Sequence, residues 1–243
     1  MTLSLVITLF LIGFVGSFIS GLVGIGGSIV KYPMLLYIPP ALGLAAYTAH
    51  EVSGISAVQV FFATISGVWA LRKDNLINYK LVAYMGAAII IGSFVGGYGG
   101  KFLTADTINL VYAVLATVAA FMMFVPKKGI DNIPLEKVQF NRTIAVIAAL
   151  IVGVASGIVG AAGAFILVPI MLLVLKIPTR MTIASSLAIT FISSIGSTVG
   201  KVIAGDVLSP YVCKCGHFYL QESAARFFFI RNGGQMMLFT VTR

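Results

Sequence analysis

Long apolar runs alternate with short polar breaks along the chain. A run of about 20 apolar residues is long enough to cross a bilayer as a helix. Runs of roughly that length cover residues 3–24, 49–71, 81–103, 107–125, 143–160 and 181–204. Two shorter apolar runs, 28–45 and 164–178, each follow a glycine cluster. The pattern predicts an all-α, polytopic integral membrane protein with about eight transmembrane segments.

The composition agrees with this pattern. Hydrophobic residues make up 59% of the 243 residues and charged residues 9%, whereas soluble domains carry about 25% charged residues. The net charge of +9 comes from Lys and Arg residues that sit singly or in pairs between apolar runs. They form no basic face, so we expect no nucleic-acid partner, and the lipid bilayer is the expected environment.

The two halves of the membrane region are related in sequence. The stretch SGLVGIGGSIVKYP (20–33) aligns without a gap to SGIVGAAGAFILVP (156–169), with six of fourteen positions identical. We predict a first membrane repeat at 1–125, a linker at 126–142 and a second, incomplete repeat at 143–210. Five apolar segments precede the linker, and an odd number inverts the second copy relative to the first. Inverted repeats with broken helices are typical of secondary transporters.

The positive charges of the loops predict the orientation. Nine Lys or Arg residues fall on one side of the predicted topology, and Lys101 and Lys201 fall on the other. Positive residues concentrate in cytoplasmic loops. We therefore expect a multi-pass plasma-membrane protein with its N-terminus outside and the 126–142 linker in the cytoplasm.

The glycine clusters predict breaks between helices. A broken helix exposes N–H groups and the positive end of a helix dipole, and both favour an anion. The predicted substrate-binding residues at these breaks are Gly24, Gly26, Gly27, Ser28, Gly160 and Gly163, and the predicted helix-shaping residues are Pro33 and Pro169. The alternative is that these glycines serve close helix packing. A nucleotide loop is excluded, since SGLVGIGG lacks the Lys-Ser/Thr of a P-loop.

Three further features are candidates for binding or coupling. Lys31 lies next to the first cluster and would suit an anion, or it extends to the membrane interface. Ser193 and Ser194 belong to a hydroxyl-rich run that suits a substrate path or helix–helix hydrogen bonds. His50 and Glu51 could carry a proton, or they cap a helix in a capping box with Thr48.

No motif indicates a metal, a cofactor or an enzyme. Cys213, Cys215 and His217 are too few and too closely spaced for a structural zinc site. The chain has seven acidic residues in total and no hydrolase motif. We expect no enzymatic activity.

The paired glycine–proline motifs, with MTIASSLAITFISSIGSTVG (181–200) after the second, resemble the TauE/SafE family of sulfite exporters and related permeases. The similarity covers about residues 1–210. The resemblance implies a membrane transporter of a small anion, such as sulfite or an organosulfonate, built from two homologous halves.

Two departures leave alternatives open. The second motif has GAAGA where the family is usually richer in glycine. Residues 211–243 form an atypical tail with no further spanning run, as in a truncated or lineage-specific end. The prediction is an alternating-access permease for a small anion substrate. The alternatives are a non-transporting membrane subunit or scaffold and an inactive truncated paralogue, and a homo-oligomer is an open alternative for its assembly.

Overall fold

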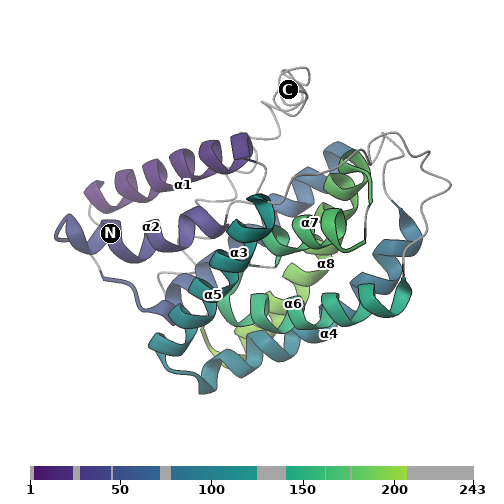
Figure 1. Ribbon diagram of the computed structural model, residues 1–243. Coiled ribbons are helices and arrows are strands. Elements are labelled where there is room, and N and C mark those ends of the chain that lie inside the picture. Colours follow the sequence, from purple (N-terminus) through teal and green to yellow (C-terminus); the bar gives the residue numbers. More distant parts are fainter. Residues whose placement is uncertain are drawn as a thin grey trace.

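The computed structural model describes residues 3–23, 28–44, 46–71, 78–124, 141–161, 163–175 and 177–206. All the regular structure in these ranges is helical (Figure 1). The helices are α1 (Leu3–Val23), α2 (Ser28–Ala41), α3 (Ala49–Leu71), α4 (Tyr79–Gly99), the short 3-10 helix η1 (Gly100–Phe102), α5 (Ala105–Phe124), α6 (Arg142–Val159), α7 (Ala164–Leu173) and α8 (Thr179–Ala204). The predicted tail lies outside the described residues, as does nearly all of the predicted linker.

Local sequence signals mark the start of α4 and both ends of α6. The Asn78 side chain accepts a hydrogen bond from the Leu81 N–H at 3.1 Å and so caps α4. Asn141 caps α6 in the same way, through the N–H groups of Thr143 and Ile144. At the other end of α6, Gly160 adopts the left-handed conformation that commonly closes a helix.

Within the described residues, five helical segments are long and apolar enough to cross a membrane. They are Ala49–Trp69 in α3, Tyr79–Phe102 in α4 and η1, Ala105–Met122 in α5, Arg142–Val159 in α6 and Met181–Ala204 in α8. Helix α1 contains a shorter apolar stretch, Ile7–Gly16. The structure therefore supports a multi-pass membrane protein with five candidate spans among the described residues, fewer than the eight expected. The apolar stretch found in α1 is short, and α2 and α7 are only 14 and 10 residues long.

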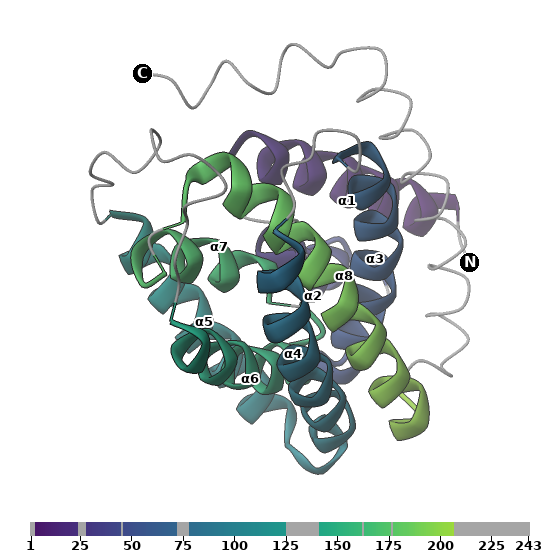
Figure 2. The ribbon, with the colours of Figure 1, turned by 90° about the vertical axis from the view of Figure 1, so that its right-hand side faces the viewer.

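Helix α4 packs along both α6 and α8 (Figure 2). Glycines allow this close approach. A side chain at Gly96 would overlap the backbone of Val154, and one at Gly97 would lie 2.9 Å from the carbonyl oxygen of Ser197. Small residues bring helices together in this way in membranes, where van der Waals packing drives association.

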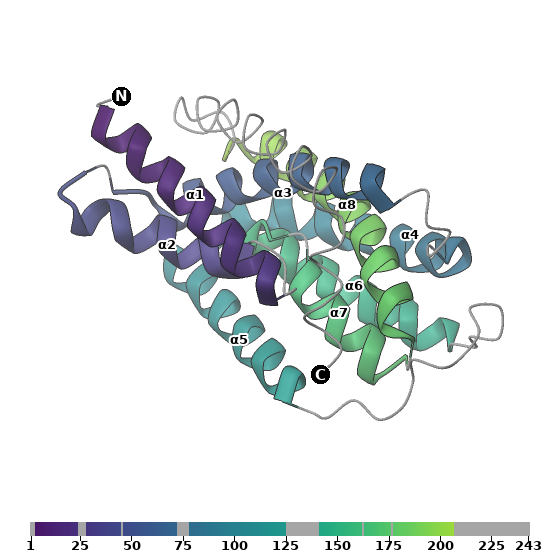
Figure 3. The same cartoon turned by 90° about the horizontal axis from the view of Figure 1, so that it is seen from above.

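The contacts also give the relative directions of the helices. In the contacts between α4 and α8 the residue numbers rise together, since Gly86 lies against Ile192 and Gly97 against Ser197. The two helices therefore run parallel. Between α3 and α8 the residue numbers run in opposite directions. The Thr198 hydroxyl donates to the Ala57 carbonyl, and Phe191 stacks on Phe61. Helices α3 and α8 are therefore antiparallel. Figure 3 shows α1, α2 and α5 on the side of the molecule away from α4 and α8.

Candidate functional site

A lysine is completely buried near the end of α8. The Lys201 side chain has no exposed surface, and its Nζ donates to the Ser53 hydroxyl oxygen at 2.8 Å. The same nitrogen lies 3.4 Å from Oδ2 of Asp206. Taking an ammonium group out of water is costly unless it is paired and hydrogen-bonded. Ser53 and Asp206 supply that compensation, and the bond to Ser53 ties the end of α8 to the start of α3.

The chain turns back after α8 to bring Asp206 to this lysine. Gly205 is in the left-handed conformation, and the Asp206 N–H donates to the Lys201 carbonyl at 3.1 Å. The Asp206 carbonyl oxygen lies against α3, where a Cβ atom at Gly54 would be only 2.9 Å away. Glycine at position 54 therefore leaves room for the turn that carries the carboxylate.

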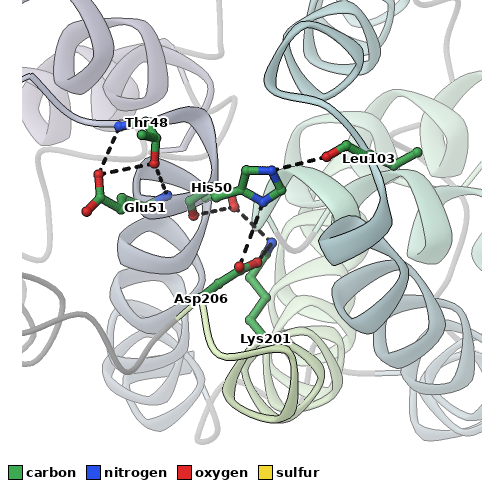
Figure 4. A network of polar contacts seen from close by, with 7 residues as sticks. Thr48, His50, Glu51, Leu103, Lys201 and Asp206 are labelled. Carbon is green, nitrogen blue, oxygen red and sulfur yellow. Dashed lines mark hydrogen bonds and ion pairs between the residues drawn. The ribbon is translucent and has the colours of Figure 1, made fainter.

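His50 lies between Asp206 and the end of η1 (Figure 4). Its Nδ1 is 3.7 Å from Oδ1 of Asp206, and its Nε2 is 3.1 Å from the carbonyl oxygen of Leu103. The Ser53 hydroxyl donates to the His50 carbonyl at 2.8 Å, so its oxygen remains free to accept from Lys201. We call His50, Ser53, Lys201 and Asp206 the charge cluster.

Buried hydroxyl groups extend from the charge cluster along α8. Successive positions three or four residues apart share one face of a helix. On α8 these are the buried residues Ser186, Thr190, Ser193, Ser197 and Lys201. Thr190 bonds back to the Ser186 carbonyl, whereas the Ser193 and Ser197 hydroxyls have no hydrogen-bond partner within the described structure, nor does Ser56 on α3. Buried hydroxyls are normally paired, so these three have capacity for a ligand.

The break between α6 and α7 lies next to the charge cluster. Gly160 and Gly163 both have positive φ, at 77° and 70°. A Cβ atom at Gly160 would overlap the carbonyl oxygen of Ser53, the residue that binds Lys201. At Gly163 it would lie 2.8 Å from Cγ1 of Val152. Gly160 thus makes a close backbone contact with Ser53, and that contact places the break beside a buried cation.

The first glycine cluster is described only in part. Gly24, Gly26 and Gly27 lie outside the described residues, and Ser28 is the first residue of α2. Lys31 is buried in α2, and its Cγ lies 2.7 Å from where a Cβ atom at Gly16 of α1 would be. Its side chain is thus enclosed by protein. Pro33 lies inside α2 and Pro169 inside α7.

The other sequence candidates divide between two roles. Glu51 forms the capping box, because its Oε2 accepts from the Thr48 N–H at 2.9 Å and from the Thr48 hydroxyl at 3.1 Å. The neighbouring His50 points to Asp206 instead. Ser194 is buried but donates to the Phe191 carbonyl at 2.7 Å, whereas Ser193 keeps its hydroxyl unpaired.

The sequence pattern did not indicate Lys201 or Asp206 as site residues. Lys201 was counted among the loop charges, but it lies inside α8 and is buried. A signal was present: Ser193, Ser197 and Lys201 follow one another at four-residue spacing, which places a cation on the hydroxyl face of a single helix. Within the described residues, no group of three or more His, Cys, Asp or Glu side chains could hold a metal ion, and the CKCGH stretch lies outside them.

The chain is similar in sequence to known membrane transporter proteins. The chain is 24% identical to the probable membrane transporter protein YunE of Bacillus subtilis, over 83% of this chain and 80% of that protein. It is 27% identical to a probable membrane transporter protein of Xylella fastidiosa, over 76% of this chain and 69% of that protein. No solved structure matches the chain. The family described as sulfite exporter TauE/SafE matches residues 9–215. With most of its length matched, and with apolar helices long enough to span a membrane, the chain belongs to the TauE/SafE family of membrane transporters.

Proposed function

We propose that this protein is a secondary transporter of a small anion, with sulfite or an organosulfonate as the substrate class, and that it works in the plasma membrane. The observation that carries the proposal is the completely buried ammonium of Lys201 at the end of a face of buried hydroxyls. A charged side chain at membrane depth commonly marks a substrate or ion path. A cation beside unpaired hydroxyl donors suits an oxyanion.

The arrangement of the helices supports alternating access. Helices α3 and α8 follow the first and second glycine motifs, and they run antiparallel, which is the relation that an inverted repeat requires. The substrate would bind between these helices and the breaks at Gly24–Gly27 and Gly160–Gly163, with Ser28, Lys31, Ser193 and Ser194 as further contacts. We add Lys201, which the sequence did not indicate, to these proposed substrate contacts.

The orientation proposed from the loop charges fits the same scheme. The N-terminus would lie outside and the 126–142 linker in the cytoplasm. Since α3 would then begin on the outer side, the charge cluster at its first turns would lie toward the outside. Anions arriving from that side would meet His50 and Asp206 before Lys201.

A flux assay tests the proposal. The full-length protein is reconstituted into vesicles, and uptake of sulfite, sulfate, thiosulfate and methanesulfonate is measured with and without a pH gradient. We expect saturable flux of at least one of these anions and loss of that flux in Lys201→Met. If the intact, inserted protein carries none of them, the transporter proposal is wrong and the non-transporting subunit is favoured.

A further inference from the structure

We propose that anion binding at Lys201 is coupled to uptake of a proton by the His50–Asp206 pair, one proton for each negative charge bound. The inference rests on the proposed anion site and adds a coupling ion to it. It follows from the groups that the two ring nitrogens of His50 face and from the charge balance around the buried ammonium of Lys201.

The hydrogen-bond partner of His50 fixes its tautomer. A carbonyl oxygen can only accept, so the 3.1 Å contact with Leu103 requires that Nε2 carries a hydrogen. In the neutral ring the other nitrogen, Nδ1, then has a lone pair. That lone pair faces Oδ1 of Asp206 at 3.7 Å, which is longer than a hydrogen bond. A proton between Nδ1 and Oδ1 would turn two facing acceptors into a hydrogen-bonded pair.

The His50–Asp206 pair is partly exposed at the surface of the protein, whereas the lysine is buried. The His50 side chain is 28% exposed and that of Asp206 is 11% exposed, whereas Lys201 has no exposed surface. The proton would therefore come from the adjoining aqueous phase. The two oxygens of the Asp206 carboxylate have different neighbours, because Oδ2 faces Lys201 and Oδ1 faces His50.

Charge balance links the proton to the anion. With no substrate, Lys201 and Asp206 carry opposite charges, so these two residues together have no net charge. A monovalent anion next to the ammonium would give the cluster a net negative charge, which is costly in a site shielded from water. A proton on His50 or on Asp206 restores neutrality in either case. The proton also weakens the attraction between Asp206 and Lys201, so that the anion can take the place of the carboxylate.

The neighbouring ionisable groups do not replace the pair in this role. Glu51 is on the same helix as His50, but its carboxylate is engaged by Thr48 at the cap. Lys101 of η1 and Asp106 of α5 are exposed to solvent. Among the described residues of α3, η1, α5 and α8 that flank the cluster, Asp206 is the acidic group placed against Lys201, and His50 is the basic group placed against Asp206.

Calorimetry on the purified full-length protein tests the coupling. Methanesulfonate is the probe, since its own charge does not change between pH 5 and pH 8. Titration in two buffers of different ionisation enthalpy gives the number of protons taken up per anion bound. We expect about one proton for the unaltered protein, and an affinity for methanesulfonate that rises as the pH falls.

Two variants make the result specific. In Asp206→Asn the side chain stays neutral, so we expect methanesulfonate to bind with no proton uptake and with little pH dependence. Asp106→Asn removes an exposed carboxylate and should keep about one proton per anion. Size-exclusion profiles of both variants show whether they are folded.

The outcomes separate this inference from the transporter proposal. Methanesulfonate binding to the unaltered protein without proton uptake overturns the coupling and leaves the anion site in place. Unchanged proton uptake in a folded Asp206→Asn protein also overturns it. Absence of binding for methanesulfonate, sulfite, sulfate and thiosulfate overturns the anion site, and the coupling with it.

Discussion

The Nζ of Lys201 and the hydroxyl oxygen of Ser53 lie 2.8 Å apart, although 148 positions separate the two residues along the chain. The bond joins α8, which follows the second glycine motif, to α3, which follows the first. It is therefore a contact between the two predicted halves at a buried cation. Any movement of one half against the other would have to keep, stretch or exchange this bond.

Replacing the buried lysine should affect both function and stability. Lys201→Met removes the cation, leaves the Asp206 carboxylate without its partner, and should abolish anion binding. Breaking a fully buried pair by removing one partner costs about 3–5 kcal/mol, and the loss here should be smaller because the remaining Asp206 carboxylate is partly exposed. The double variant Lys201→Met/Asp206→Asn should regain most of the lost stability while binding remains absent. Thermal unfolding in detergent and anion titration measure the two effects.

The control for this prediction is Lys101→Met, which removes an exposed lysine and should leave both measurements unchanged. Equal anion affinity in Lys201→Met and the unaltered protein would contradict the assignment of the cation to the substrate.

The unpaired hydroxyls of α8 should matter for binding more than for folding. Ser197→Ala removes a buried hydroxyl that has no partner in the described structure, so stability should stay the same or rise slightly. If the hydroxyl donates to the substrate, anion affinity should fall about tenfold, as for a hydrogen bond to a charged group. The comparison is Thr117→Ala on α5, where the hydroxyl already bonds to the Ala113 carbonyl. Loss of stability without loss of affinity would make Ser197 a structural residue.

Gly160, at the break between α6 and α7, should tolerate no side chain. Gly160→Ala places a Cβ atom against the Ser53 carbonyl and forces a left-handed conformation that costs about 1–2 kcal/mol for other residues. The matched control is Gly43→Ala, because Gly43 also has positive φ but has open space around it. We expect a small decrease in melting temperature for Gly43→Ala and a much larger one, or loss of folded protein, for Gly160→Ala. Similar melting temperatures would mean that the break can move away from α3.

The positions of the helices could be predicted from the sequence, because each spanning helix needs a long apolar run. The run 143–160 became α6 at Arg142–Val159, and the run 181–204 became α8 at Thr179–Ala204. The hydrophobic pattern was less informative about α2 and α7, since short apolar runs do not specify how deeply a helix enters the membrane.

The charge cluster could not be predicted in the same way. The partners of Lys201 come from α3 and from the turn after α8, and hydrophobic periodicity carries no information on such tertiary contacts. Counting Lys201 as a topological charge also removed it from the candidates. Its burial reverses that argument, because a positive charge that faces protein instead of water says little about which side of the membrane its helix end occupies.

The remaining topological prediction therefore rests on the other positive residues, which are concentrated at one side of the predicted spans. With Lys201 set aside, Lys101 is left on the outer side, so the asymmetry becomes stronger. A reporter enzyme active only in the cytoplasm, fused after residue 132, should be active. The same reporter fused in the η1–α5 connection, after residue 104, should be inactive. This second fusion is the matched control, since the two sites are separated by the single predicted span α5. An inactive reporter at 132 with an active one at 104 would invert the orientation and place the charge cluster at the cytoplasmic end of α3.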